Sequence, residues 1–282
     1  MPRPRQVDLS ALTLRLQTAG PVTAQALAEA AGVDRSNISR ALASLGEQVV
    51  SLGVTRGTRY ALRRDVRGAG SRFPIYRVGA DGRAQSWAEL TALHPREWRL
   101  AWENGADGAP EWARLVHDHA GLCEGFPFFL GDVRPQGYLG RAIAGRLSPA
   151  LGLPADPRDW SDDDTLIYLQ SEGDDLPGNV VVGDGPMRRI ASAQLTAPAI
   201  VAESERAQRY VAFASFAAAG GVAGSSVEGE QPKFTALLGE TISDPASARH
   251  VIVKFTDLLE TPTGRRWADL LAAEAHAHAV LS

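Results

Sequence analysis

Two lysines carry the chemistry that this sequence is best equipped to perform. Lys233 and Lys254 are the only lysines among 29 basic residues, since every other cation is Arg. Lys233 closes a glycine-rich loop that begins at Gly220, and Lys254 ends the apolar run 250–254. A glycine-rich loop followed by a strand lysine is the order in which ATP-binding lobes cover and clamp phosphates. The spacing therefore predicts a nucleotide-phosphate site, although an ordinary surface loop before a core strand would give the same pattern.

The elements that must position these lysines belong to a chain long enough for about two domains. Its 282 residues are 44% hydrophobic, as in ordinary globular proteins. The sequence has no apolar run of about 18 residues, and its N-terminus lacks the apolar core of a signal peptide. Cys123 is the single cysteine, and we expect it to be a small buried hydrophobic group. These features predict a cytoplasmic protein without membrane contact.

Charge is distributed unevenly along the chain. Residues 1–72 contain eleven Arg against five acidic residues, a formal charge of +6. Because the whole chain carries −4, the remainder carries −10. A basic N-terminal segment on an acidic body is typical of proteins of which one end meets nucleic acid.

Residues 1–66, which make up most of this basic segment, resemble a winged helix-turn-helix. Its first helix is predicted to start at Leu9 and stop at Gly20, and the other two cover 24–31 and 35–45. Thr23 and Asp34 are expected to cap the second and third helices. Two short strands over 49–53 and 58–62 then form a hairpin, the wing.

The third helix of this segment is the expected DNA-recognition helix. Contacts to bases and phosphates are expected from polar side chains of this helix and of the hairpin, namely Arg35, Ser36, Asn37, Ser39, Arg40, Arg56 and Arg59. The alternative is a winged helix that makes only protein contacts. Salt-dependent binding of the segment to duplex DNA separates the two interpretations.

A linker is predicted over 67–72, and a mixed α/β region follows it. Residues 73–78 read as a strand and 176–183 as a turn into a strand, whereas 87–93 fits either a helix or a strand.

Two groups of residues, a run of aspartates and two pairs of histidines, could bind a metal ion, but we expect structural roles for both. The aspartates at 162–164 are expected to lie at a helix N-terminus, where acidic side chains are favourable. The histidine pairs 117/119 and 276/278 are two residues apart, which on a helix separates their directions by about 200°. We therefore expect no metal ligand among them.

With these motifs in place, the chain resembles the HipA-like serine/threonine kinases, the toxin components of bacterial toxin–antitoxin pairs. The stretch 226–233, Ser-Val-Glu-Gly-Glu-Gln-Pro-Lys, is similar to the ATP-covering loop of that family. Residues 250–254 are similar to its nucleotide-binding strand, and 270–275 to the helix whose glutamate supports the strand lysine. Segments 129–141 and 176–183 are similar to its N-terminal subdomain.

The resemblance covers about residues 73–282 and implies an α+β multidomain fold. Residues 1–66 would be a winged helix-turn-helix DNA-binding domain, as in a branch of the family that carries one. Residues 73–215 would be the HipA-like N-terminal subdomain. Residues 216–282 would be the start of a kinase-like ATP-binding lobe.

The resemblance also implies ATP and Mg²⁺ as cofactors. The residues that it places at the nucleotide are Ser226, Val227, Gly229, Gln231, Lys233, Lys254 and Glu274. Lys254 would contact the α/β phosphates and be held by Glu274, while Gly229 would let backbone amides approach phosphate oxygens. Ser226 would be an autophosphorylation site that shuts the kinase down, because a phosphate adds about −1.5 to −2 charges beside an anionic ligand.

The sequence departs from the family pattern after Lys254. A kinase needs a catalytic-loop Asp and metal-binding Asn and Asp residues, and none can be placed there. We therefore assign no catalytic and no metal-binding residue, and expect a truncated or partial kinase that does not transfer phosphate. The apolar face on which a second lobe would dock is expected to cause dimerisation or poor solubility.

The expected partners follow from these interpretations. Duplex DNA is one. An antitoxin protein and a protein Ser/Thr substrate would be partners of a complete family member. The alternative function is that of a winged-helix transcription regulator whose second domain senses a small ligand and ignores ATP.

Overall fold

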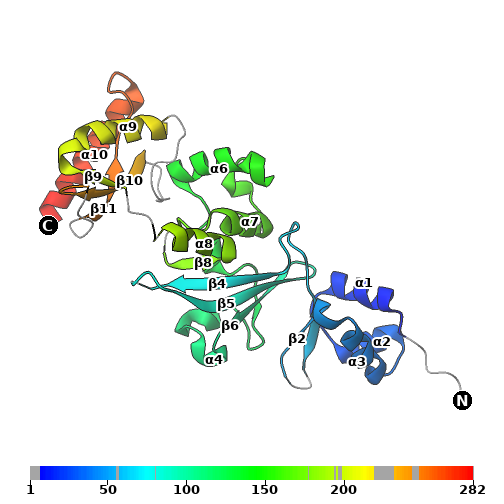
Figure 1. Cartoon of the computed structure of the whole chain (residues 1–282). Coiled ribbons are helices and arrows are strands. Elements are labelled where there is room, and N and C mark those ends of the chain that lie inside the picture. Colours follow the sequence, from blue (N-terminus) through cyan, green and yellow to red (C-terminus); the bar gives the residue numbers. More distant parts are fainter. Residues whose placement is uncertain are drawn as a thin grey trace, which may run out of the picture. The chain divides into compact units, whose positions relative to one another are not determined.

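The structure is a computed structural model that describes residues 7–54, 57–79, 81–176, 178–193, 195, 199–218, 232–242 and 248–281. It is a mixed α+β protein (Figure 1). Packing divides it into two compact units, Met1–Asp132 with Val180–Met187 and Val133–Asn179 with Arg188–Ser282. The functional domains inferred from the sequence remain predictions.

Three helices open the first unit at the predicted places. They are α1 (Leu9–Ala19), α2 (Ala24–Ala31) and α3 (Arg35–Ser44). As predicted, Thr23 caps α2, since its Oγ1 accepts a hydrogen bond from Ala26 N at 3.2 Å. Asp34 stands at the cap position of α3, but only its backbone carbonyl is used, and it accepts from Asn37 N at 2.9 Å.

Apolar residues at helical spacing hold these helices together. Leu12 and Leu16 of α1, Leu27 of α2, and Ile38 and Leu42 of α3 are each 5% exposed or less and form one cluster. This packing leaves the polar side of α3 toward solvent, where Arg35 and Arg40 are exposed.

A small antiparallel sheet follows the helices. A 3₁₀ turn, η1 (Gly46–Gln48), leads into β2 (Val49–Leu52), which pairs with β3 (Arg59–Leu62). The other edge of β3 pairs with β1 (Val22–Thr23), so that the strand order is β1-β3-β2.

Residues 65–71, which include most of the predicted linker 67–72, form an ordered turn. The Asp65 carboxylate accepts hydrogen bonds from Gly68 N at 2.6 Å and Gly70 N at 3.0 Å. Val66 is fully buried, and its N–H donates to the carbonyl of Gly70 at 2.8 Å. One side chain thus organises a glycine-rich stretch that composition alone describes as flexible.

A five-stranded antiparallel sheet forms the rest of the first unit. Its strands are β4 (Arg72–Val78), β5 (Ala84–Leu93), β6 (Glu97–Trp102), β7 (Leu122–Cys123) and β8 (Val180–Val182), in the order β7-β6-β5-β4-β8. The ambiguous segment 87–93 lies in a strand. The last four residues of β5, from Leu90 onward, are all buried, which explains why no alternation of polar and apolar residues marked it.

Short elements and tryptophans cover this sheet. They include α4 (Gly105–Gly108), η2 (Glu111–Leu115) and α5 (Phe128–Gly131). The rings of Trp87 and Trp102 meet edge to face at 4.9 Å, and Trp112 lies 6.0 Å from each of them. These tryptophans form a packed aromatic cluster.

Helices dominate the first part of the second unit. They are α6 (Gly137–Leu151), η3 (Pro157–Asp159) and α7 (Asp162–Glu172), while α8 (Asp184–Ala193) begins in the first unit and ends in the second. The aspartates at 162–164 open α7 as predicted. Ser161 and Asp164 form a reciprocal capping box there.

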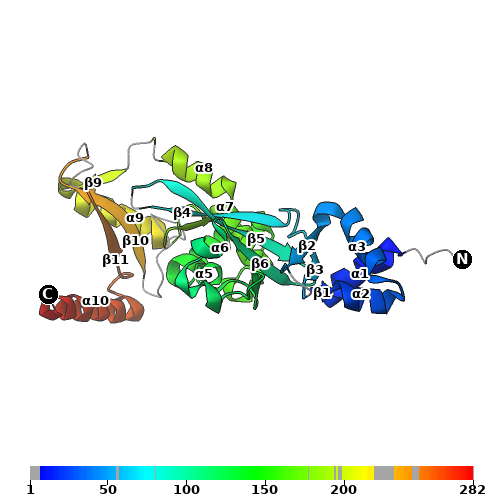
Figure 2. The same ribbon diagram turned by 90° about the horizontal axis from the view of Figure 1, so that it is seen from below.

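The last part of the second unit is a three-stranded sheet with two helices. After β9 (Ile200–Ala202), η4 (Glu203–Glu205) and α9 (Arg206–Ala218) come β10 (Lys233–Gly239), β11 (Arg249–Lys254) and α10 (Pro262–Leu281). The order is β11-β10-β9, with β10 antiparallel to β11 and parallel to β9. Phe234 is fully buried against Tyr210 and Phe213 of α9 at ring distances of 5.4 and 5.5 Å. Helix α10 lies on one side of the strand pair, at an angle to the strands (Figure 2).

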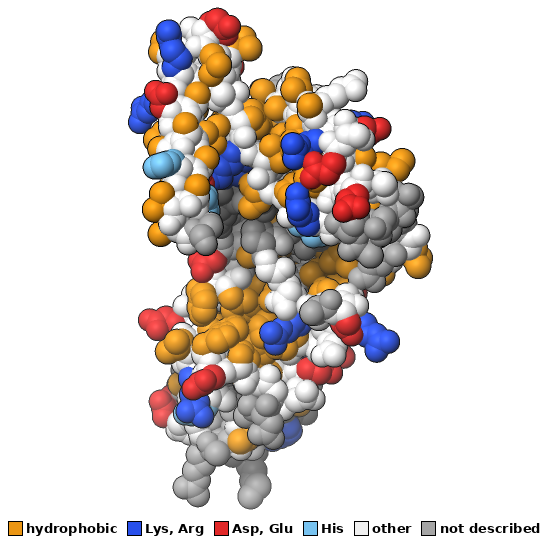
Figure 3. All heavy atoms as spheres, turned by 90° about the vertical axis from the view of Figure 1, so that its left-hand side faces the viewer, with side chains coloured by type: hydrophobic (Ala, Val, Ile, Leu, Met, Phe, Trp, Pro, Cys, Tyr) orange, Lys and Arg blue, Asp and Glu red, His pale blue; other side chains and the backbone are white. Residues whose placement is uncertain are grey.

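Large hydrophobic side chains are exposed in this last part. Val211, Ile252, Leu258 and Val280 are each 55% exposed or more. Figure 3 views the side on which α9 and α10 lie in Figure 1, and shows hydrophobic side chains among charged ones. Within the described residues, no helix is both long and apolar enough to cross a membrane.

Candidate functional site

The two lysines of the sequence meet across the β10–β11 pair. Lys233 lies directly opposite Lys254 in the antiparallel register. Directly opposed residues point to the same face of a sheet, where like charges repel each other. Lys233 is only 4% exposed. Two ammonium groups are therefore concentrated on one face, a distribution that favours an anionic ligand.

A carboxylate from α10 completes this cluster. Glu274 Oε1 accepts a hydrogen bond from Lys254 Nζ and forms an ion pair with it. This hydrogen bond is the main reason that the pKa of Glu274 lies below its ordinary value; burial opposes the shift, and the charges of Lys254, His278 and Lys233 add to it. Glu274 is therefore ionised at neutral pH, and one carboxylate faces two lysines.

Hydrogen bonds order the segment between β11 and the start of α10, the helix that carries Glu274. Thr256 Oγ1 donates to the carbonyl of Gly264 at 2.6 Å, and Gly264 N donates to Thr261 Oγ1 at 2.9 Å. A Cβ on Gly264 would lie 2.0 Å from the carbonyl oxygen of Leu258. Only glycine fits here. The sequence analysis missed this residue, although Thr followed by Pro, at 261–262, is a helix-start signal.

The predicted loop residues cannot be placed. Ser226, Val227, Gly229 and Gln231 lie outside the described residues. The first described residue after them, Pro232, accepts a hydrogen bond through its carbonyl from Phe255 N at 3.0 Å. The chain therefore enters β10 beside the end of β11, where Lys254 is the last residue.

On α3, the predicted DNA-contacting side chains lie on an accessible surface. Arg35, Ser36, Ser39 and Arg40 are exposed and Asn37 is half-buried. Arg40 Nη2 donates to Asn37 Oδ1 at 2.7 Å and Arg40 Nε to the carbonyl of Ser36 at 3.3 Å. These side chains are hydrogen-bond donors and acceptors, and they could form hydrogen bonds with a DNA duplex in place of those within the helix.

Of the two hairpin residues predicted to contact DNA, Arg56 and Arg59, the structure describes only Arg59. Arg56 lies outside the described residues. Arg59 lies in β3 and pairs with Asp118, which precedes β7. The sequence analysis missed Asp118; its only local signal is the turn-forming pattern Asp-His-Ala-Gly.

Other chemically active residue types are in structural roles. His117 Nε2 accepts a hydrogen bond from Trp102 Nε1 at 2.7 Å. Cys123 is 3% exposed, and burial raises the pKa of its thiol to about 12. Among the described residues, His, Cys, Asp and Glu side chains form no group of three or more that could hold a metal ion.

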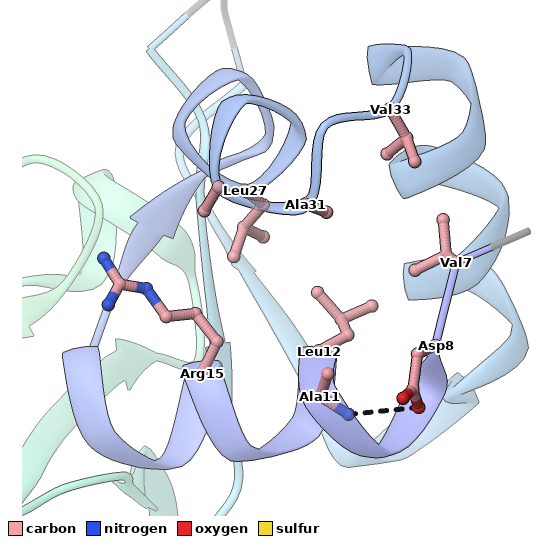
Figure 4. A pocket seen from close by; sticks show the side chains of 9 residues that line it. Val7, Asp8, Ala11, Leu12, Arg15, Leu27, Ala31 and Val33 are labelled. Atoms are coloured by element: carbon pink, nitrogen blue, oxygen red, sulfur yellow. Dashed lines mark hydrogen bonds between the residues drawn. The ribbon is translucent and has the colours of Figure 1, made fainter. Parts of the chain in front are cut away.

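A hollow of about 500 Å³ lies between α1 and α2 (Figure 4). Leu12, Leu27 and Val33 give it an apolar lining. Its carboxylate, Asp8, caps α1 by accepting from Ser10 N at 2.9 Å and from Ala11 N at 3.3 Å. Because this carboxylate is already engaged, we assign no ligand to the hollow.

Comparisons with known proteins find similarity to toxins. Residues 69–191 match the family described as YjjJ-like toxin, middle domain. Toxin YjjJ of Escherichia coli (strain K12) is 37% identical over 262 residues, which are 93% of this chain and 55% of that protein. The chain therefore spans about half the length of this curated relative. No solved structure matches the chain.

Neither match names a kinase or a winged helix, so these two features remain predictions. Both matches are described as toxins. The family model covers the middle region, and the relative aligns with nearly the whole length of the chain. Residues 69–191 are thus similar to the middle domain of a YjjJ-like toxin, and most of the chain is similar to about half of Toxin YjjJ.

Proposed function

We propose that β10, β11 and α10 form a nucleotide-binding lobe of a HipA-like kinase toxin. The observation that carries this proposal is the Lys254–Glu274 ion pair on the same face as Lys233. Protein kinases use a strand lysine held by a helix glutamate to contact the α/β phosphates of ATP. The similarity to Toxin YjjJ supports a toxin function.

The described residues fit ATP better than they fit its metal ion. The Lys254 side chain is 32% exposed and can turn its ammonium group to phosphate oxygens, while the charge of the buried Lys233 lies opposite it on the same face. Mg²⁺ is bound by one or two carboxylates together with substrate phosphates, and Glu274 is engaged with Lys254. We therefore derive no step through the metal. Protein Ser/Thr phosphorylation, autophosphorylation at Ser226 and an antitoxin partner belong to this proposal as expectations for a complete family member.

Calorimetric titration of the 282-residue chain with ATP tests the lobe. We expect Lys254→Ala to lower the affinity for ATP about 10- to 100-fold, because charge-assisted hydrogen bonds to phosphate are lost. Glu274→Gln should cause a smaller loss, since the lysine remains but is no longer held. Arg266→Ala removes one exposed cation from α10 and should leave the affinity unchanged.

Two results would contradict the lobe. One is no saturable binding of ATP by the wild-type chain, which favours the regulator that ignores ATP. The other is equal affinity of the wild type and Lys254→Ala while circular dichroism shows both to be folded.

A second function, binding of duplex DNA by α1–α3 and the hairpin, is favoured by the exposed polar side of α3 and the +6 charge of residues 1–72. Phosphate neutralisation by Arg makes such binding fall steeply with salt. We expect the full chain to bind a labelled mixed-sequence duplex in fluorescence anisotropy, with a strong salt dependence. Binding that is absent at low salt, or indifferent to salt, would contradict this function.

A further inference from the structure

One face of the β2–β3 hairpin is covered by the five-stranded sheet. Val50, Leu52 and Ala61 of the hairpin are each 8% exposed or less and form one cluster with Leu93 of β5. Ala120 and Leu122, from the loop before β7 and from β7, pack at its edge. If the hairpin contacts DNA, it must therefore do so through its other face or its tip.

Main-chain contacts lock the same junction. Arg63, just after β3, forms an antiparallel bridge with Leu93. The N–H of His94 donates to the carbonyl of Leu62 at 2.8 Å, and the N–H of Arg64 donates to the carbonyl of Ala92 at 2.9 Å. The hairpin and the end of β5 are thus joined by hydrogen bonds in addition to the ordered turn at 65–71. These contacts place the hairpin at a fixed position on the sheet.

The charged contact at this junction involves a residue predicted to bind DNA. Arg59 Nη2 donates to Asp118 Oδ2. The other oxygen of Asp118 accepts from Ala120 N at 2.8 Å and from Leu122 N at 3.0 Å, so that the carboxylate is held in place by its own loop. The side chains of Arg59 and Asp118 are 33% and 43% exposed. An accessible ion pair of this kind contributes little to stability and can be exchanged for another anion.

We propose that Asp118 competes with DNA phosphate for the guanidinium of Arg59, so that the sheet limits the DNA affinity of the hairpin. The proposal rests on the DNA binding proposed above. The competition acts through Arg59, which makes it separable from a general effect of negative charge.

A double-mutant cycle measured by fluorescence anisotropy on a labelled duplex tests the competition. The proteins are the wild type, Asp118→Asn, Arg59→Ala and the double variant. Asn keeps a side-chain oxygen for Ala120 N and Leu122 N. We expect Asp118→Asn to tighten binding about two- to fivefold at low salt, the range for an exposed pair. The dependence of log K on log[salt] should steepen by ~0.9, for one added phosphate contact. In the Arg59→Ala background, Asp118→Asn should have no effect.

A matched control separates competition from net charge. Glu124→Gln removes one exposed carboxylate from the opposite end of β7 and should not tighten binding as Asp118→Asn does. An equal gain in Glu124→Gln, a gain that persists without Arg59, or no gain in Asp118→Asn would each overturn the proposal while leaving DNA binding intact. Failure of the wild-type chain to bind the duplex would remove both proposals.

Discussion

The two cationic surfaces of this chain are built in opposite ways. On α3, Arg40 finds its partners one turn away on the same helix and stays exposed. In the β10–β11 pair, Lys233 is buried, and the acid that holds Lys254 comes from α10, twenty residues further along the chain. Because the partners of Arg40 lie on the same helix, we expect α3 to keep its structure when one of these side chains is removed. A cluster assembled from three elements fails when any one of them shifts, so we expect the larger mutational effects in the second unit.

The largest effect is expected from Gly264→Ala. The added Cβ would overlap the backbone carbonyl of Leu258, which cannot rotate away. Forced overpacking typically costs about 1–3 kcal/mol. The start of α10 should move, and ATP affinity should fall at least as far as in Glu274→Gln. Urea unfolding together with calorimetry measures both quantities.

The control for this variant is Gly145→Ala in α6. A Cβ there meets no atom within 4 Å, and alanine favours a helix over glycine by about 0.5–1 kcal/mol. Gly145→Ala should be neutral or stabilising and should bind ATP normally. Equal behaviour of the two variants would show that the start of α10 does not position Glu274.

The next effect tests the exposed surface. In Arg35→Ala/Arg40→Ala, the slope of log K against log[salt] for duplex binding should become shallower by about 1.8, that is ~0.9 for each lost phosphate contact. The thermal midpoint should stay close to that of the wild type, because both side chains are exposed. A large loss of stability instead would mean that these arginines have a structural role.

A smaller effect is expected at acid pH. The pKa of Glu274 lies below its ordinary value of 4.5, mainly because of the hydrogen bond from Lys254. A group with a lowered folded-state pKa stabilises the fold above its unfolded pKa, and this contribution is lost as the pH falls through the folded value. The difference in thermal midpoint between the wild type and Glu274→Gln should therefore be present at neutral pH and shrink as the pH falls below the ordinary value of 4.5. A difference that grows on acidification would exclude the ion pair as its cause.

The smallest effect concerns Cys123. Its pKa of about 12, against an ordinary 9.0, leaves about a thousandfold less thiolate at neutral pH. Reaction with a disulfide reagent should be slow until denaturant opens the first unit, so that labelling follows the unfolding of this unit separately from the second. Fast labelling of the native chain would show that β7 opens locally.

Local signals predicted much of the N-terminal part. Thr23 and the leucines at helical spacing were sufficient for α1 and α2, because caps and periodicity are properties of neighbouring residues. At 67–72 the glycines predicted a linker, but composition did not reveal that the Asp65 carboxylate binds two backbone amides there. Local signals were ambiguous at 87–93, since burial of consecutive residues depends on what covers both faces of the sheet.

The candidate sites likewise contain residues that local sequence signals reveal and residues whose contacts depend on the fold. The exposed residues of α3 could be named from spacing alone. Glu274 was reached through the family resemblance, because its distance from Lys254 along the chain says nothing about contact. Asp118 could not be found, since its relation to Arg59 exists only after the hairpin packs on the sheet.

The place of β8 has a consequence for biosynthesis. This strand covers the edge of β4 but is encoded after the whole stretch 133–179, which belongs to the other unit. At ~5–20 residues per second, a ribosome needs about 2–9 s to add that stretch. During this interval the nascent chain has a hydrogen-bonding strand edge without its final neighbour, and such edges recruit strands from other molecules. Chaperone demand during translation should therefore peak between the completion of β6 and the emergence of Val180–Val182.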